Sequence, residues 1–152
     1  MRRLLVFSSL VAVLVLGAAC GEPAPEPPPY RFVASVADIM NGIVDPNAVV
    51  IFESVGTIVD LNGINDFQPE TDEEWVEVAD RALGLAESAN LLLMPERSEG
   101  RDLWIEAALG MSDRAVRVSE TALLRDPEAL LQAGGELYEE CLACHEAYII
   151  EP

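Results

Sequence analysis

This chain has 152 residues, and its 27 acidic residues far outnumber nine arginines, with no lysine at all. A net charge of −18 at pH 7 repels nucleic acid and anionic lipid, so we expect no nucleic-acid partner and favour a protein partner with a basic docking surface. Solubility or adaptation to a salty habitat would explain the same charge. The length suits one domain with a single hydrophobic core behind an N-terminal leader.

Residues 1–19 have the pattern of an export signal. Arg2 and Arg3 supply a positive start, and the apolar run from Leu4 to Leu16 is short for a membrane span. The pattern therefore predicts an exported, periplasmic protein.

The end of this signal resembles the lipobox of bacterial lipoproteins, in which a cysteine is lipidated and becomes the new N-terminus. The matching residues run from Leu16 to Gly21, and the resemblance implies that Cys20 carries the lipid. The protein would then contact the membrane only through this lipid anchor. Gly17 stands where the family usually has an aliphatic residue, so cleavage after Ala19 to give a soluble protein stays open. The Pro-rich residues 20–30 are typical of an extended tether, or else of a disordered leader.

Residues 31–152 are predicted to form an all-α domain. Apolar residues recur at helical spacing, and Asp-Pro pairs and a capping box at Thr71 mark helix starts. The turn dipeptide Asn62-Gly63 lies in a long connection that can hold a small hairpin. We expect Phe32 and Phe52 in the core, and Trp75 and Trp104 in the core or against a cofactor. The predicted helices span 32–44, 46–55, 71–94, 101–124 and 127–149.

The first two of these segments are read as one interrupted helix, so the pattern predicts four amphipathic helices with mostly short connections. Such helices pack as a four-helix bundle, whose core is a usual place for a cofactor.

The run Cys141-Leu142-Ala143-Cys144-His145 is the attachment pattern of a c-type haem. Cys141 and Cys144 would form thioethers with the haem vinyl groups, and His145 would give the iron its proximal nitrogen. Residues three and four apart share one face of a helix, so all three side chains can address one haem. Two other interpretations of the motif fit less well. A redox Cys-x-x-Cys pair is typical of a βαβ unit, and a zinc site needs further Cys or His ligands.

The position of this motif near the C-terminus of the last helix, followed by the aromatic Tyr148, resembles the class II cytochromes c, the cytochrome c-prime family. The match covers about residues 32–150. It implies a four-helix bundle with one covalently bound haem c. Family members often carry a basic residue directly after the aromatic, where this chain has Ile149. They also often dimerise through their first two helices, so a homodimer and a monomer both stay open.

The resemblance implies that the first helix covers the other face of the iron, with a Met in electron carriers and an apolar residue in gas-binding members. Met40 lies on the apolar stripe of the first helix and matches that position. A Met/His pair raises the haem potential. The alternative is that Met40 fills the core, with Met111 or Met94 as other candidate ligands.

These expectations favour a monohaem electron carrier in the periplasm, with His145 and Met40 as axial ligands. The alternative is a gas-binding cytochrome that takes nitric oxide or carbon monoxide at an open or displaceable distal site. A structural bundle that carries haem without a redox role is a further reading. The only histidine is assigned to iron and no nucleophile has a base partner, so we predict no enzyme.

Overall fold

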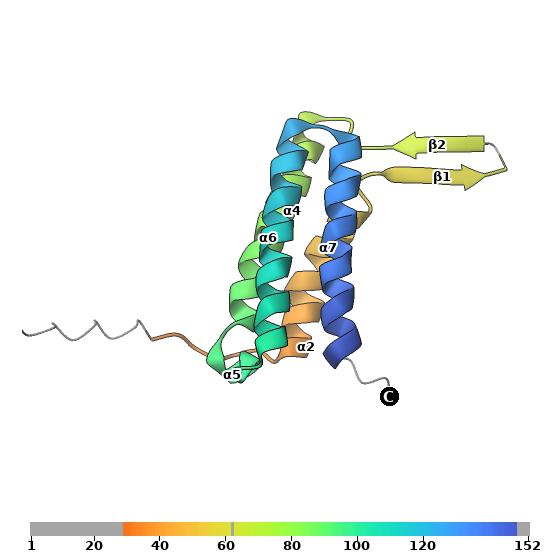
Figure 1. Ribbon diagram of the computed structural model, residues 1–152. Helices are drawn as coiled ribbons and strands as arrows, with labels where there is room; N and C mark the ends of the chain where they lie inside the picture. The colour runs from red at the N-terminus through yellow and green to blue at the C-terminus, as the bar shows by residue number, and fades with distance from the viewer. Residues whose placement is uncertain (1–28, 62, 149–152) are drawn as a thin grey trace, which may run out of the picture. The chain divides into compact units, whose positions relative to one another are not determined.

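Helices form most of the chain in the computed structural model, which describes residues 29–61 and 63–148 (Figure 1). The chain divides into two units, Met1–Arg31 and Phe32–Pro152, and every element below belongs to the second. The predicted export signal, Cys20, residues 20–28 of the predicted tether, Asn62 and Ile149 lie outside the described residues. The prediction of a predominantly helical domain is confirmed, and a two-stranded hairpin adds to it.

The first helical stretch begins later than predicted, because a side-chain cap fixes its start at Val36. The Ser35 hydroxyl accepts a hydrogen bond from the Asp38 backbone N–H at 3.1 Å, and the Asp38 carboxylate accepts one from the Ser35 N–H at 2.9 Å. This reciprocal capping box satisfies two N–H groups that the helix leaves free. The stretch consists of the α-helix α2 (Val36–Ile39), the π-helix η1 (Met40–Val44) and the α-helix α3 (Asp45–Phe52).

The prediction that Phe32 and Phe52 lie in the core is wrong. Phe32 precedes the cap, is 50% exposed and packs under the Arg97 guanidinium, which lies 4.5 Å from the ring centroid. Phe52 is 37% exposed and meets the ring of Tyr138 edge-on at 5.8 Å. Both rings therefore lie at the edges of the packed interior.

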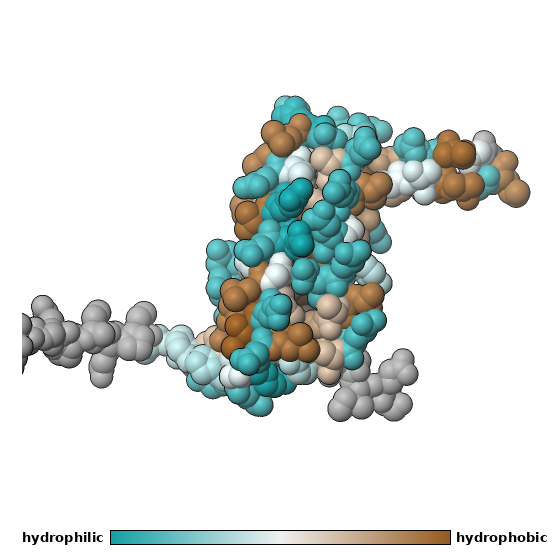
Figure 2. All heavy atoms as spheres, viewed as in Figure 1, coloured by the Kyte–Doolittle hydropathy of each residue, from teal (hydrophilic) through white to brown (hydrophobic). Residues whose placement is uncertain are grey.

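A β-hairpin of β1 (Gly56–Asp60) and β2 (Gly63–Phe67) follows α3. The strands are antiparallel, with Gly56 opposite Phe67 and Asp60 opposite Gly63. Gly63 has φ of +128°, a conformation that glycine adopts without a steric penalty. The hairpin extends away from the helices, and its apolar side chains are exposed (Figure 2).

Three long helices complete the domain and match the predicted ones closely. The Thr71 hydroxyl accepts a hydrogen bond from the Glu74 N–H at 3.2 Å, which confirms the predicted capping box. Arg125, in the left-handed conformation at φ 57°, ends the second long helix. The helices are α4 (Asp72–Leu92), the short α5 (Pro95–Ser98), α6 (Asp102–Leu124) and α7 (Pro127–Tyr148).

The hydrophobic core lies where α4 packs on α6, α6 on α7, and α3 on α4. Trp75 and Trp104 are both buried in it, as predicted. The contact between α3 and α7 is much smaller, which leaves a cleft between these two helices. Among the described residues, no helix is long and apolar enough to cross a membrane. The largest side chains with full burial are Ile39, Ile51, Leu85, Val118, Leu130 and Leu137.

Candidate functional site

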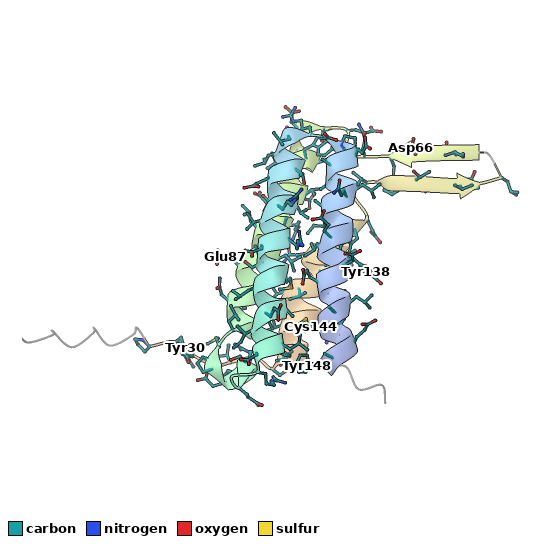
Figure 3. All side chains as sticks on the ribbon, viewed as in Figure 1. Tyr30, Asp66, Glu87, Tyr138, Cys144 and Tyr148 are labelled. Atoms are coloured by element: carbon teal, nitrogen blue, oxygen red, sulfur yellow. The ribbon has the colours of Figure 1, made fainter. Side chains whose placement is uncertain are left out.

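Helix α7 brings the three motif side chains to one site. Cys141, Cys144 and His145 lie in its last two turns, and all three line the same cleft. Figure 3 places Cys144 and Tyr148 near the C-terminal end of α7 and Tyr138 closer to its middle. The spacing of three and four residues thus acts as the sequence analysis expected, since α7 is helical throughout the motif.

The cleft has a volume of about 880 Å³ and separates α7 from the α2–η1–α3 stretch. This volume lies within the range of roughly 300–1,000 Å³ that is usual for cofactor and ligand sites. A cavity of about 50 Å³ adjoins it, and Met40, Cys141, Cys144 and His145 line both. The cleft wall is largely apolar, although the polar Asn41 and Asp45 also line it. Its apolar and aromatic members include Val36, Val44, Ala48, Phe52, Trp104, Tyr138, Leu142 and Tyr148.

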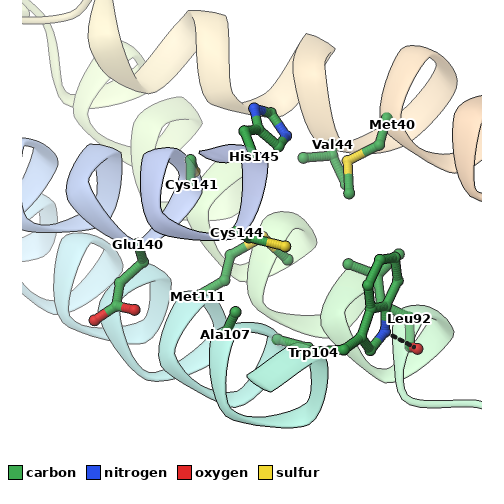
Figure 4. A pocket seen from close by; sticks show the side chains of 11 residues that line it. Met40, Val44, Leu92, Trp104, Ala107, Met111, Glu140, Cys141, Cys144 and His145 are labelled. Atoms are coloured by element: carbon green, nitrogen blue, oxygen red, sulfur yellow. Dashed lines mark hydrogen bonds between the residues drawn. The ribbon is translucent and has the colours of Figure 1, made fainter. Parts of the chain in front are cut away.

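Met40 is the methionine that shares the large cleft with His145. Figure 4 shows both side chains extending into the space between α7 and the helix that carries Met40, with Val44 beside them. Met111 is 5% exposed and lines only the smaller cavity. The Met94 sulfur accepts a hydrogen bond from Arg97 Nη1 at 2.7 Å and does not line the cleft. Of the candidate methionines, Met40 is therefore the one placed opposite the motif.

Two aromatic rings form one part of the cleft wall. Trp104 and Tyr148 meet edge-on with ring centroids 5.2 Å apart. The buried indole N–H of Trp104 donates a hydrogen bond to the Leu92 carbonyl at 2.8 Å, which fixes the ring (Figure 4). This position agrees with the prediction that Trp104 lies in the core or against a cofactor.

Sequence reasoning missed Arg101, which lies behind this wall. Its guanidinium stands 4.5 Å from the Trp104 ring centroid and 5.0 Å from that of Tyr148, in cation–π geometry. Its Nε–H and Nη2–H donate to the carbonyls of Ser98 and Arg97. Arg101 belongs to a charged segment 40 positions before Cys141, so no local pattern connects it to the motif. Only the packing of α6 on α7 brings it close.

The electrostatic environment keeps both motif thiols protonated near neutral pH. Burial raises the pKa of the Cys141 thiol, and the neighbouring Cys144 and Glu140 raise it further. Burial also raises the pKa of the Cys144 thiol, an effect that the charge of Arg101 opposes. Reactive Cys-x-x-Cys pairs instead have lowered thiol pKa values. The two cysteines are also free rather than joined in a disulfide.

Glu140 borders the smaller cavity next to Cys141, and an arginine from α6 balances its charge. Arg114 Nε lies 3.6 Å from Glu140 Oε1, and Arg114 Nη1 donates to Glu136 at 2.8 Å. A Cβ at Gly110 would lie 2.7 Å from Glu140 Oε2, so the missing side chain leaves room for the carboxylate in this position. The pair therefore ties α6 to α7 directly beside the motif.

Comparison with protein-family models, with curated proteins and with solved structures finds no match to this chain. Within residues 29–61 and 63–148, no group of three or more His, Cys, Asp or Glu side chains is arranged to hold a metal ion by itself.

Proposed function

We propose that this protein is an exported monohaem c-type cytochrome that carries electrons, built as a four-helix bundle of the class II type. The observation that carries the proposal is the meeting of Cys141, Cys144 and His145 on one face of α7 with Met40 across an apolar cleft. The packing of α4, α6 and α7, with α2–η1–α3 as the remaining side, supports the bundle.

The residues of the cleft fit a haem on three grounds. Two free thiols three residues apart suit covalent attachment, and the imidazole that follows suits iron ligation. The cleft is large enough for a cofactor and mainly apolar. A haem held here supplies one-electron redox chemistry through its iron.

In this proposal each group of the chain has a defined role. Cys141 and Cys144 would hold the cofactor by thioethers, and His145 and Met40 would supply the nitrogen and the sulfur that bind its iron. The apolar walls keep water out, and the bundle keeps both ligands in place. Little rearrangement then accompanies electron transfer. The exposed rims of the cleft, at Leu142 and Tyr138, offer a short route to a partner.

The proposal includes export and a basic partner. The acidic excess favours a redox protein with a basic docking surface through electrostatic steering. Residues 1–19 would be removed, and lipid on Cys20 would tether the mature protein to the periplasmic side of a membrane. Incorporation of labelled fatty acid should therefore occur in the wild type and disappear in Cys20→Ser. Equal labelling of the two would contradict the anchor.

The haem itself is tested by a peroxidase stain on a denaturing gel, which detects only covalently attached haem. The wild-type band should stain, and Cys144→Ala should lose most of the stain. The control is Cys20→Ser, which keeps the motif intact and should stain like the wild type. An unstained wild-type protein, produced with export and haem-attachment machinery, would contradict the proposal. A stained protein with five-coordinate, high-spin iron would instead favour gas binding.

A further inference from the structure

The helix that carries Met40 contains one π-turn, and its position has a chemical cause. In an uninterrupted α-helix the N–H of residue 46 would donate to the carbonyl of Gly42. Pro46 has no N–H, and its ring would clash with that carbonyl. The chain instead widens, and the Asp45 N–H reaches back five residues to the Met40 carbonyl. Such π-turns occur frequently at functional sites.

The widened turn changes which side chains face inward. The buried residues Val44, Ala48 and Ile51 follow steps of four and three, as in an α-helix. The step from Ile39 to Val44, across the π-turn, is five. The additional residue thus keeps one buried face continuous along α2, η1 and α3.

The register of Met40 depends on this additional residue. In a regular α-helix the carbonyl of Asn41 would accept from the Asp45 N–H, so Asn41 would occupy the place that Met40 holds. Each residue before the turn would rotate by about 100° relative to α3. The Asn41 amide, which now lines only the large cleft, would then lie where the Met40 thioether borders the smaller cavity.

We infer that Pro46 is a positioning residue: by holding the π-turn open, it directs the Met40 thioether, rather than the Asn41 amide, into the smaller cavity that His145 lines. Asn41 lines only the large cleft. This inference rests on the proposed function, because it assigns a purpose to the placement of Met40. Pro46 lines neither the cleft nor the smaller cavity and is exposed. It acts only through the backbone.

The test measures the near-infrared absorption band that appears when a methionine sulfur is bound to ferric low-spin haem. Pro46→Ala should lose more than half of this band while it keeps its haem stain and far-ultraviolet helical signal. Pro127→Ala is the matched control, since Pro127 also follows an aspartate at a helix start but no helix precedes it without a break. It should keep the band. Pro46 is itself exposed, so its replacement removes no buried side chain.

A second variant tests the register directly. If Pro46→Ala lets the helix close, a methionine at position 41 takes the place of Met40, so Pro46→Ala with Asn41→Met should recover the band. An unchanged band in Pro46→Ala would overturn the inference, and so would a lost band that Asn41→Met does not restore. Failure of the proposed function looks different, because the wild-type protein would then lack the band or the haem.

Discussion

Replacing each of the two methionines beside the motif in turn distinguishes a methionine that binds the iron from one that only fills the core. Met40 and Met111 both line the smaller cavity, but only Met40 also lines the large cleft. We therefore expect Met40→Ala to abolish the sulfur-to-iron band and to convert the iron to a high-spin form. Met111→Ala should leave the band in place.

The loss of unfolding free energy in each variant should not parallel the loss of the near-infrared band. Met111 is 5% exposed, so its truncation to alanine should cost roughly 2–5 kcal/mol of unfolding free energy, the range for a buried methionine. For a domain of this size, each 1 kcal/mol corresponds to about 4 °C in Tm, so the loss is roughly 8–20 °C. The assay is a thermal melt followed by far-ultraviolet circular dichroism, alongside the near-infrared spectrum of each variant.

Two results would refute this reasoning. A Met40→Ala protein that keeps the band would show that another group binds the iron. A Met111→Ala protein that loses the band but melts like the wild type would assign the ligand role to Met111. Each variant replaces one methionine of the same cavity, so each serves as the control for the other.

Two further changes test the cleft wall and a helix start. Trp104→Phe removes the indole N–H that donates a hydrogen bond to the buried Leu92 carbonyl. We expect the free energy of unfolding by denaturant to fall by about 1–3 kcal/mol, with the haem stain retained. An unchanged unfolding midpoint would contradict the role of this bond. Hydrogen bonds from the backbone N–H groups of Glu70 and Thr71 lower the pKa of the Glu74 carboxyl below its ordinary value of 4.5. Its stabilising effect is therefore complete above about pH 4.5 and is lost as the pH falls through the lowered folded-state pKa. The stability gap between wild type and Glu74→Gln should shrink over that acidic range, and a gap independent of pH would contradict this cause.

The sequence predicted the helices wherever a local chemical signal marks their ends. Thr71 with Glu74 and the pair Asp126-Pro127 mark two starts that the structure confirms, because capping is decided within a few residues. The start at Val36 was missed, since the apolar spacing of Phe32 and its neighbour extended the helical pattern past the true cap.

Tertiary packing decided the features that the sequence left unpredicted. Pro46 indicated from the sequence that the helix is interrupted at this point, but it did not indicate that the interruption is a π-turn. Ile39 and Val44 are both buried, and the five-residue step between them agrees with the widened turn. Arg101 reaches the motif only because α6 packs on α7, and no periodicity within either helix encodes that contact.

The measurement that tests the central claim most directly is the absorption spectrum of the purified, exported protein in its ferric and ferrous states. Our account predicts one covalently bound haem that is low-spin in both states, with a weak near-infrared band in the ferric form that Met40→Ala removes. A five-coordinate, high-spin ferric spectrum would contradict ligation by Met40. A protein without any haem absorption would contradict the account as a whole.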